Sequence, residues 1–423
     1  MFSLGQPLTY VQLNDPQAQD KDVEATVEHI VNGLFSVLVT LGVVPVIRCP
    51  KGGPAEMVAS QLDSRLREHL TARNNLFTEA GHLGSSFQRP LLCIFDRNFE
   101  LAAGVQHVWS YRSMVHDILG MKLNRVVQGG KAYELDDSDS FWVSNSSAPF
   151  SKIAEMVEAQ LNKYKQDVDA VNRRAGSKGE MDFDDQELIG NTKHLMSAVN
   201  SLPELTERKK MIDKHTNLAT ALLSEIKARS IDGYYNLEDD MLARGSVDRN
   251  ALLTILKGKG TKEDKLRTAI VYLLAIEVTP AAEIEAIEGA LKEADIDISS
   301  FLYVKKMKSL NSTLVAAASG SRNNLVDWAE KLYGQSLSAV TAGVKNLLSG
   351  ARQLAVTRAM ESLMEARPGP ETEGYLVFDP RSPKSSSLGH LQGTFKEAIV
   401  FMIGGGNYNE YLSLQELAQR QQP

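Results

Sequence analysis

The sequence predicts an α/β domain with a parallel sheet, divided into two segments by a large, all-α helical insertion. Residues 91–95 form a continuous apolar run, as expected of a strand that is buried on both faces. Helical and strand-like segments alternate around this run, which is typical of a parallel sheet with helical crossovers. A second run of this kind, residues 397–403, appears only near the end of the chain. We therefore expect residues 1–122 and 394–423 to share one sheet, and residues 123–393 to form the insertion.

The first segment contains the elements of such a sheet in order. Residues 8–13 are expected to be a short strand or an extended entry segment. Apolar residues at three- and four-residue steps then predict a helix that ends at Gly42, which suits the position after a helix. A strand at residues 43–48 and a helix at residues 55–70 follow. After the run at 91–95, an irregular connection leads into a helix that begins near Val108.

Composition and charge argue against several classes of protein. With 423 residues, of which 43% are hydrophobic, the chain is long enough for two or three globular domains. The net charge of −7 argues against a general nucleic-acid-binding protein, which needs a basic face. Residues 30–47 approach the length of a membrane span, but Gly33 and Pro45 interrupt them. Cys49 and Cys93 lie in apolar runs and are expected to be buried thiols. A cytoplasmic protein is therefore expected.

The insertion is expected to carry a projecting helical hairpin at residues 183–230. Proline fits the first turn of a helix but not its interior, so a second helix is expected to begin at Pro203 and to pack on residues 183–199. Its apolar residues follow the spacing of a coiled-coil seam, and a second stripe lies beside them. The seam consists of Leu205, Ile212, His215, Ala219, Leu222 and Ile226, and the second stripe of Met211 and Leu218. One stripe can pack inside the hairpin and the other can hold a partner. On periodicity alone, packing within the chain is the simpler alternative.

Residues 311–349 differ from the ordinary helical segments before them. Small residues are followed by Leu325, Trp328 and Leu332 at helical steps, which makes the segment amphipathic. Three roles remain open: a disordered insertion, a lid over the hairpin, or a face that rests on a membrane through Trp328.

No residue pattern in the chain points to catalysis. The Gly404–Gly406 turn lacks the spacing of known phosphate-binding loops. Cys93 has no partner base, and His107 and His116 have no ligand spacing typical of a metal site. The chain is therefore predicted not to be an enzyme and to have no catalytic, cofactor-binding or metal-binding residues. The alternative is an α/β enzyme or binding domain that uses the Gly404–Gly406 turn for a phosphorylated small molecule.

Three separated stretches resemble the Sec/Munc (SM) family of SNARE-binding vesicle-fusion proteins. The first begins at Pro90 and follows the pattern PLL-x3-DR-x3-L-x5-H-x-W-x-Y-x3-V-x-D-x-L. The second is SLPELTERKKMIDKHTNLATALL from Ser201, and the third is EAIVFMIGGGNY from Glu397. Their sequences are similar to those of the ER–Golgi, Sly-type branch of the family. Two positions depart from the family pattern: Glu100 stands where an aspartate is usual, and Gly104 where a proline is usual.

The resemblance implies a SNARE-assembly chaperone that acts in ER–Golgi vesicle docking and fusion, without a cofactor. Its partners would be a syntaxin-type Qa-SNARE, an R-SNARE, the assembled SNARE bundle and tethering factors, at the periphery of ER–Golgi membranes. In the family, a projecting hairpin holds SNARE helices. The corresponding residues here are Pro203, Leu205, Met211, Ile212, His215, Leu218, Ala219 and Leu222.

The resemblance also bears on the two ends of the chain and on its amphipathic segment. It implies that residues 311–349 are a regulatory lid. Transient membrane contact through this segment remains a separate possibility. The family's N-terminal domain, which captures a syntaxin peptide, has no counterpart before Met1. The last strand and helix of the family's middle domain would follow Pro423. We therefore expect a partial chain.

Overall fold

The computed structural model describes residues 2–15, 17–72, 76–77, 89–175, 185–318, 353–365, 372, 374–382 and 394–421. The chain falls into two compact units. The first consists of Met1–Gln106, Asn236–Gly258 and Lys262–Pro423, and the second of His107–Tyr235 and Lys259–Thr261.

The first unit contains a four-stranded sheet with the strand order β5–β1–β2–β6. β1 (Val46–Pro50), β2 (Leu91–Asp96) and β6 (Ala398–Ile403) are parallel, and β5 (Tyr375–Phe378) is antiparallel to β1. β6 pairs with β2 along its whole length, from Leu91 opposite Ala398 to Asp96 opposite Ile403. The predicted fold class is confirmed, since the end of the chain returns to the sheet of its beginning. β5 makes the sheet mixed, which was not predicted.

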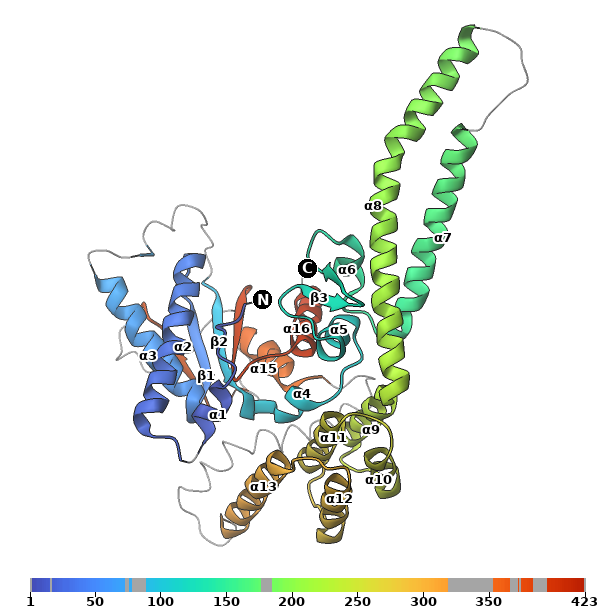
Figure 1. The fold of residues 1–423 in the computed structure, drawn as a ribbon. Helices are drawn as coiled ribbons and strands as arrows, with labels where there is room; N and C mark the ends of the chain where they lie inside the picture. Colours follow the sequence, from blue (N-terminus) through green and yellow to red (C-terminus); the bar gives the residue numbers. More distant parts are fainter. Residues whose placement is uncertain are drawn as a thin grey trace. The chain divides into compact units, whose positions relative to one another are not determined.

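Helices cover both faces of this sheet (Figure 1). α2 (Asp20–Leu41) and α3 (Gly53–Thr71) pack on the face that contains Leu92 and Ile94. α15 (Ala355–Met364) and α16 (Tyr408–Gln421) pack on the face that contains Leu91, Cys93 and Phe95. Because alternate side chains of β2 point to opposite faces, coverage of both faces buries all of them. This is the physical reason for the unbroken apolar run.

A short connection and a helical bundle complete the first unit. The connection is the 3₁₀ turn η2 (Arg97–Glu100) and α4 (Leu101–Val105). The bundle begins in α9 (Ile231–Arg244) and continues with the predicted helices α10 (Arg249–Lys257), α11 (Lys262–Ala275), α12 (Ala281–Glu293) and α13 (Ser299–Ala318). It has its own core, which includes Met241, Leu256 and Phe301. The bundle belongs to the same compact unit as the sheet. The predicted domain boundaries at residues 122 and 394 stay a prediction.

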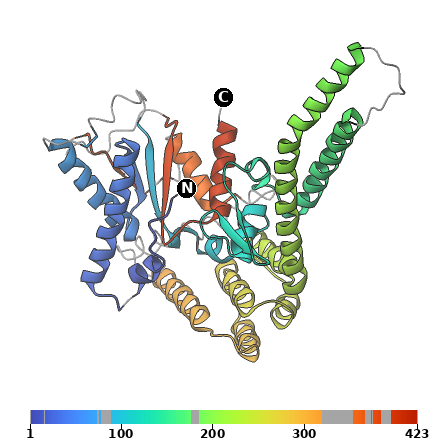
Figure 2. The same ribbon diagram turned by 45° about the horizontal axis from the view of Figure 1, so that its top comes forward.

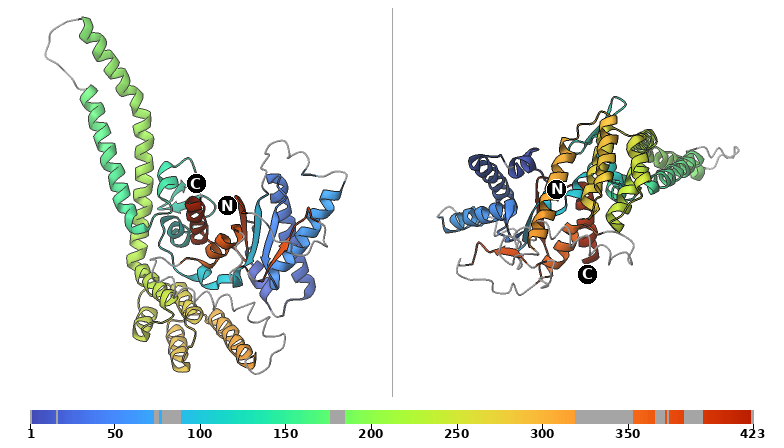
Figure 3. Two further views of the ribbon diagram at one scale, coloured as in Figure 1. Left: turned by 180° about the vertical axis from the view of Figure 1, so that it is seen from behind. Right: turned by 90° about the horizontal axis from the view of Figure 1, so that it is seen from below.

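The second unit is built on a long hairpin of α7 (Phe150–Ala175) and α8 (Asp185–Arg229). Figures 2 and 3 show the two helices side by side in each view. The C-terminal half of α8 packs on a small platform of α5 (Tyr111–Leu119), α6 (Ser140–Asn145) and the antiparallel pair β3 (Arg125–Gln128) and β4 (Lys131–Glu134). Beyond this platform the hairpin extends without other elements of the unit around it (Figure 1). A projecting helical hairpin was predicted and is present.

The composition of that hairpin corrects one prediction. α8 is a single helix with Pro203 inside it, so no new helix begins there and residues 183–199 are not its partner. The partner is α7 instead. A proline removes one backbone hydrogen bond and crowds the preceding turn, which bends a helix but does not have to end it. Figure 1 shows α8 bent in its N-terminal part.

The predicted strand or extended segment at residues 8–13 is also wrong. These residues form the short helix α1 (Thr9–Asn14), which packs on α2. Leu8 and Val11 are exposed, so neither residue belongs to a buried strand face. The Asn14 side chain donates to the Tyr10 carbonyl, which closes the single turn.

Candidate functional site

The structure separates the eight predicted hairpin residues into two groups. Ile212, His215, Leu218 and Leu222 are buried in the second unit. Pro203 is exposed, and Leu205, Met211 and Ala219 are half-buried. A buried side chain offers no surface to a partner. For the first four residues the structure therefore favours packing within the chain, the alternative that periodicity left open.

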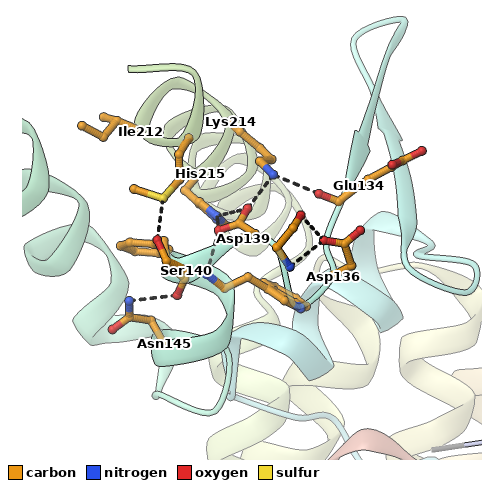
Figure 4. A network of polar contacts seen from close by, with 12 residues as sticks. Glu134, Asp136, Asp139, Ser140, Asn145, Ile212, Lys214 and His215 are labelled. Atoms are coloured by element: carbon orange, nitrogen blue, oxygen red, sulfur yellow. Dashed lines mark hydrogen bonds and ion pairs between the residues drawn. The ribbon is translucent and has the colours of Figure 1, made fainter. Parts of the chain in front are cut away.

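His215 lies at the centre of a buried polar network (Figure 4). Its Nδ1 is 3.0 Å from the Tyr111 hydroxyl of α5, and its Nε2 is 3.0 Å from Asp139 Oδ2. Lys214 Nζ lies 2.5 Å from the same carboxylate and donates to the Glu134 carbonyl of β4 at 2.9 Å. The network therefore joins α8 to α5, to β4 and to the residue that precedes α6.

Asp139 has two roles in this network. Its Oδ1 accepts the backbone N–H of Trp142 at 2.9 Å and so caps the N-terminus of α6. Burial on its own raises the pKa of the carboxyl, but the hydrogen bonds from His215, Lys214 and the Trp142 amide outweigh burial and hold this pKa below its usual range. Asp139 is therefore a carboxylate at neutral pH. Asp139 was not predicted from the sequence, although an aspartate that precedes an apolar pair by two residues is a recognisable helix cap.

An open groove of about 620 Å³ lies between α6, α7 and the middle of α8. Ser140 and Asn145 of α6, Gln160 of α7, and Arg208 and Met211 of α8 line it. Arg208 is paired with Asp167 of α7 at 2.5 Å, and the Ser140 hydroxyl is 3.4 Å from Met211 Sδ. The groove thus has a mixed polar lining along the half-buried stripe of α8.

Apolar side chains remain open on the hairpin itself. Leu202 is 53% exposed and Leu223 is 44% exposed. On α7, the apolar residues Leu161, Tyr164 and Val168 are only half-buried. Two helices cannot cover each other's apolar faces completely, so the seam of an isolated hairpin stays partly open to solvent.

The Gly404–Gly406 turn is held by the protein's own charged residues. Arg97 donates to both carboxylate oxygens of Glu410, at 2.6 and 2.9 Å, and to the Gly405 carbonyl at 3.2 Å. Glu410 also accepts the backbone N–H of Asn407 at 3.0 Å, and the Asn407 side chain accepts the Glu410 N–H. This reciprocal pair is a capping box at the start of α16. The donor that a phosphate would use is thus bound by a carboxylate, which disfavours the phosphate-binding alternative.

The two residues that depart from the family pattern, Glu100 and Gly104, both have a structural role in the first unit. Glu100 Oε2 accepts the backbone N–H of Ala355 at 2.8 Å, at the first residue of α15. A side-chain carbon at Gly104 would lie 3.3 Å from Cδ of Arg97, so the glycine leaves room for that guanidinium chain. Both departures therefore serve the packing of the first unit.

Of the other titratable residues considered in the sequence, Cys49, Cys93 and His107 are buried. Burial raises the pKa of Cys49 to about 12 and raises that of Cys93 as well, so both thiols stay protonated. His107 is buried with its ring 5.2 Å from that of Tyr234, and His116 is exposed. Among the described residues, no three His, Cys, Asp or Glu side chains are grouped so that they could hold a metal ion.

Two further expectations concern membranes. Within the described ranges, none of the helices combines the length and apolar character needed to cross a bilayer. Leu325, Trp328 and Leu332, the predicted lid and membrane residues, lie outside the described residues.

These features define a class: an α/β unit whose sheet joins both ends of the chain, with a helical hairpin on a polar platform. The whole chain, residues 1–423, matches the model of the Sec1 family. The chain belongs to the Sec1 family. Within this family it is similar to the Sly1 proteins, as the following relatives show.

SEC1 family transport protein SLY1 of Arabidopsis thaliana is 62% identical over 432 residues, which cover 100% of this chain and 69% of the relative. Sec1 family domain-containing protein 1 of Homo sapiens is 38% identical and is matched over 98% of this chain and 69% of its own length. The chain thus spans about two thirds of the length of these relatives.

Solved structures agree with the fold. A crystal structure of Sly1p in complex with an N-terminal peptide of Sed5p has a TM-score of 0.73 at 30% identity, over 98% of this chain and 66% of that one. The Unc18–syntaxin 1 complex from Monosiga brevicollis has a TM-score of 0.65 at 18% identity, over 99% of this chain and 70% of that one, and supports the fold alone. The resemblance stated from three sequence motifs is thereby confirmed.

Proposed function

We propose that this chain is a non-enzymatic SNARE-assembly chaperone of the Sly1 branch, acting in ER–Golgi vesicle docking and fusion. The observation that carries the proposal is the α7–α8 hairpin, whose apolar seam stays partly open beyond the platform, in a chain of the Sec1 family. The relative Sly1p has been crystallised with a peptide of Sed5p, so a Qa-SNARE is the partner class to test first.

The mechanism is templating of helices by a rigid surface. Disordered SNARE segments lose conformational entropy when they fold together. A hairpin that already presents apolar side chains in helical register accepts such a segment as an added helix and so reduces that cost. The contact surface proposed here is the reachable part of α8: Leu202, Pro203, Leu205 and Met211, with Ala219 at its lower end. No covalent bond is made or broken, so no cofactor is required.

Residues 311–349 enter the proposal as a regulatory lid over this surface, at the periphery of ER–Golgi membranes. Deletion of the segment is expected to strengthen binding of SNARE helices, because a covering segment competes with them. Binding would be compared between the intact chain and the deletion variant with the same R-SNARE and Qa-SNARE motifs. Equal affinity for the two proteins would remove the lid from the proposal.

Substitution of the open leucines tests the contact surface directly. Leu202→Asp and Leu205→Asp, separately and together, place a charge where an apolar helix face is expected to bind. Burial of one leucine contributes about 1.5–3 kcal/mol, so each substitution is expected to weaken binding roughly 10- to 100-fold. Affinities for fluorescently labelled R-SNARE and Qa-SNARE motifs would be measured by anisotropy.

The matched control is Val278→Asp, a change at an 80% exposed apolar residue outside the hairpin. It is expected to leave the affinity unchanged. If the double aspartate variant remains folded and binds SNARE motifs as tightly as the unchanged protein, the hairpin is not the binding surface.

A further inference from the structure

The buried network around His215 places a polar side chain where the packing of apolar side chains would be sufficient. The imidazole is 0% exposed and lies among three aromatic rings, with centroid distances of 4.4 Å to Phe141, 5.9 Å to Tyr111 and 6.4 Å to Trp142. An apolar residue would fill such a site at a lower cost of desolvation. The hydrogen bonds of the two imidazole nitrogens therefore have to explain why histidine occupies this site.

The protonation of the network follows from its partners. Burial raises the pKa of the Tyr111 hydroxyl, so this group keeps its proton, and it shares a hydrogen bond with Nδ1 of His215. Asp139 is a carboxylate and accepts, so Nε2 of His215 carries the proton that it donates at 3.0 Å. Both ring nitrogens are thereby bound, one by Tyr111 and the other by Asp139, which fixes the orientation of the ring.

This triad resembles an acid–base relay, but it lies inside the unit. Tyr111, His215 and Asp139 are exposed by 0%, 0% and 5% respectively. The neighbouring groove is lined by Asp139 but not by His215 or Tyr111. No substrate can reach the imidazole without opening the α8 interface, so the geometry supports a role in positioning rather than in chemistry.

We propose that His215 is a positioning residue that fixes the rotation and height of α8 on the platform of α5 and α6. The buried apolar neighbours Ile212, Leu218 and Leu222 hold the helix by contacts that have little directionality, and a slide by about one helical turn, which keeps the same face toward the platform, would still bury much apolar surface. Such a slide moves a helix by about 5.4 Å. It would separate His215 from both partners at once, and buried polar groups without partners are costly.

Lys214 supplies a second polar contact at the next position of the helix. It reaches Asp139 Oδ2 and the Glu134 carbonyl, so two consecutive residues of α8 are bound to the same platform. Together they determine which way the distal part of α8 presents Leu205 and Met211. This consequence rests on the proposed function, whereas the positioning of α8 itself does not.

The first experiment measures the position of α8 without any partner. Spin labels are attached to Val143→Cys on α6 and Lys209→Cys on α8, both at exposed positions, while the native thiols at Cys49 and Cys93 are buried. Pulsed electron resonance is expected to give one narrow distance distribution for the otherwise unchanged protein. His215→Ala is expected to broaden or shift it, and His215→Gln to restore it in part, since the glutamine amide can donate to Asp139.

Two variants separate position from general stability. Leu218→Ala removes a buried apolar contact of α8 and is expected to leave the distance distribution unchanged. Tyr111→Phe removes one hydroxyl, keeps the ring packing, and is expected to broaden the distribution; it replaces His215→Ala if that variant does not fold. If both polar variants give the distribution of the unchanged protein, or if Leu218→Ala broadens it as much as they do, the inference is overturned.

The second experiment measures the affinity of the same variants for SNARE motifs. His215→Ala is expected to bind SNARE motifs at least tenfold more weakly, with partial recovery in His215→Gln. If the distance distribution changes as expected while no variant, including Leu202→Asp with Leu205→Asp, alters SNARE binding, the positioning role stands and the proposed function fails. If the hairpin aspartates abolish binding but His215→Ala changes neither the distance nor the affinity, the function stands and His215 has no positioning role.

Discussion

The ion pair between Arg97 and Glu410 provides the sharpest test of the first unit. It joins the residue after β2 to the first turn of α16, and the two side chains are 8% and 6% exposed. The test removes one charge with Glu410→Gln, which keeps the shape of the side chain. The amide retains one acceptor for Arg97, but its NH₂ group faces a guanidinium donor and leaves the positive charge without a counter-ion.

The expected loss follows from this geometry. Removing one partner of a buried ion pair costs about 3–5 kcal/mol in the free energy of unfolding, because the other charge stays buried and unpaired. Burial alone lowers the pKa of Arg97, but the hydrogen bond and charge of Glu410 outweigh burial and raise it, so Arg97 remains charged in the folded protein. The capping box at the start of α16 should persist, because the glutamine oxygen can still accept the Asn407 N–H.

Hydrogen exchange of the β2 and β6 amides in increasing urea measures the free energy of unfolding of this unit. The double variant Arg97→Met with Glu410→Leu removes both charges, and its loss should be smaller than the sum of the single losses. Arg420→Met, which breaks an exposed pair with Glu416, is the control and should cost below about 1 kcal/mol. A loss below about 1 kcal/mol for Glu410→Gln would show that solvent reaches the pair, and the reasoning would then be wrong.

Three further predictions concern neighbouring residues with different environments. Leu222→Ala, at a buried site, should lower the free energy of unfolding of the second unit by about 2–5 kcal/mol, whereas Leu223→Ala next to it should cost below about 1 kcal/mol in urea denaturation. Asp139→Asn should lower the free energy of unfolding of the second unit at pH 7. Because the pKa of Asp139 is lowered in the folded state, the difference in this free energy from the unchanged protein should shrink as the pH falls below about 4. Denaturation series at several pH values measure this difference. Gly404→Ala should cost more than about 1 kcal/mol, since φ is +87° and side-chain carbons lie 3.1 Å from the added one, whereas Gly406→Ala should be tolerated in thermal melts.

β2 was predictable because burial on both faces requires an unbroken apolar run, and β6 was predictable because it has a similar run, although it is only partly buried at the end of the strand order. The helices α2 and α3 were predicted, whereas α15 was not. The helix that ends at Gly42 was equally clear, and its left-handed glycine is present with φ +67°. The antiparallel β5 was missed. It has only four residues, and a short edge strand carries too few side chains to show a period.

The hairpin shows where reasoning from periodicity reaches its limit. The register of apolar residues in α8 was recognised, but periodicity cannot tell whether an apolar face packs on its own chain or on a partner. Here Ile212 and Leu222 pack on the platform, while Leu202, outside the predicted seam, is open to solvent. Pro203 was given too much weight, because a proline inside a helix can bend it without ending it. His215 was placed in the seam as if apolar, and its partners come from segments that no local pattern connects to it.

The position of β6 has a consequence for biosynthesis. β2 needs a neighbour on each side, and the one supplied by Ala398–Ile403 leaves the ribosome only after the roughly 300 residues that separate it from Asp96. At about 5–20 residues per second, this corresponds to a delay of about 15–60 s. During that interval an apolar strand has an unpaired edge, which is a template for aggregation. A nascent chain stalled before residue 398 should therefore depend on molecular chaperones until residues 398–403 emerge.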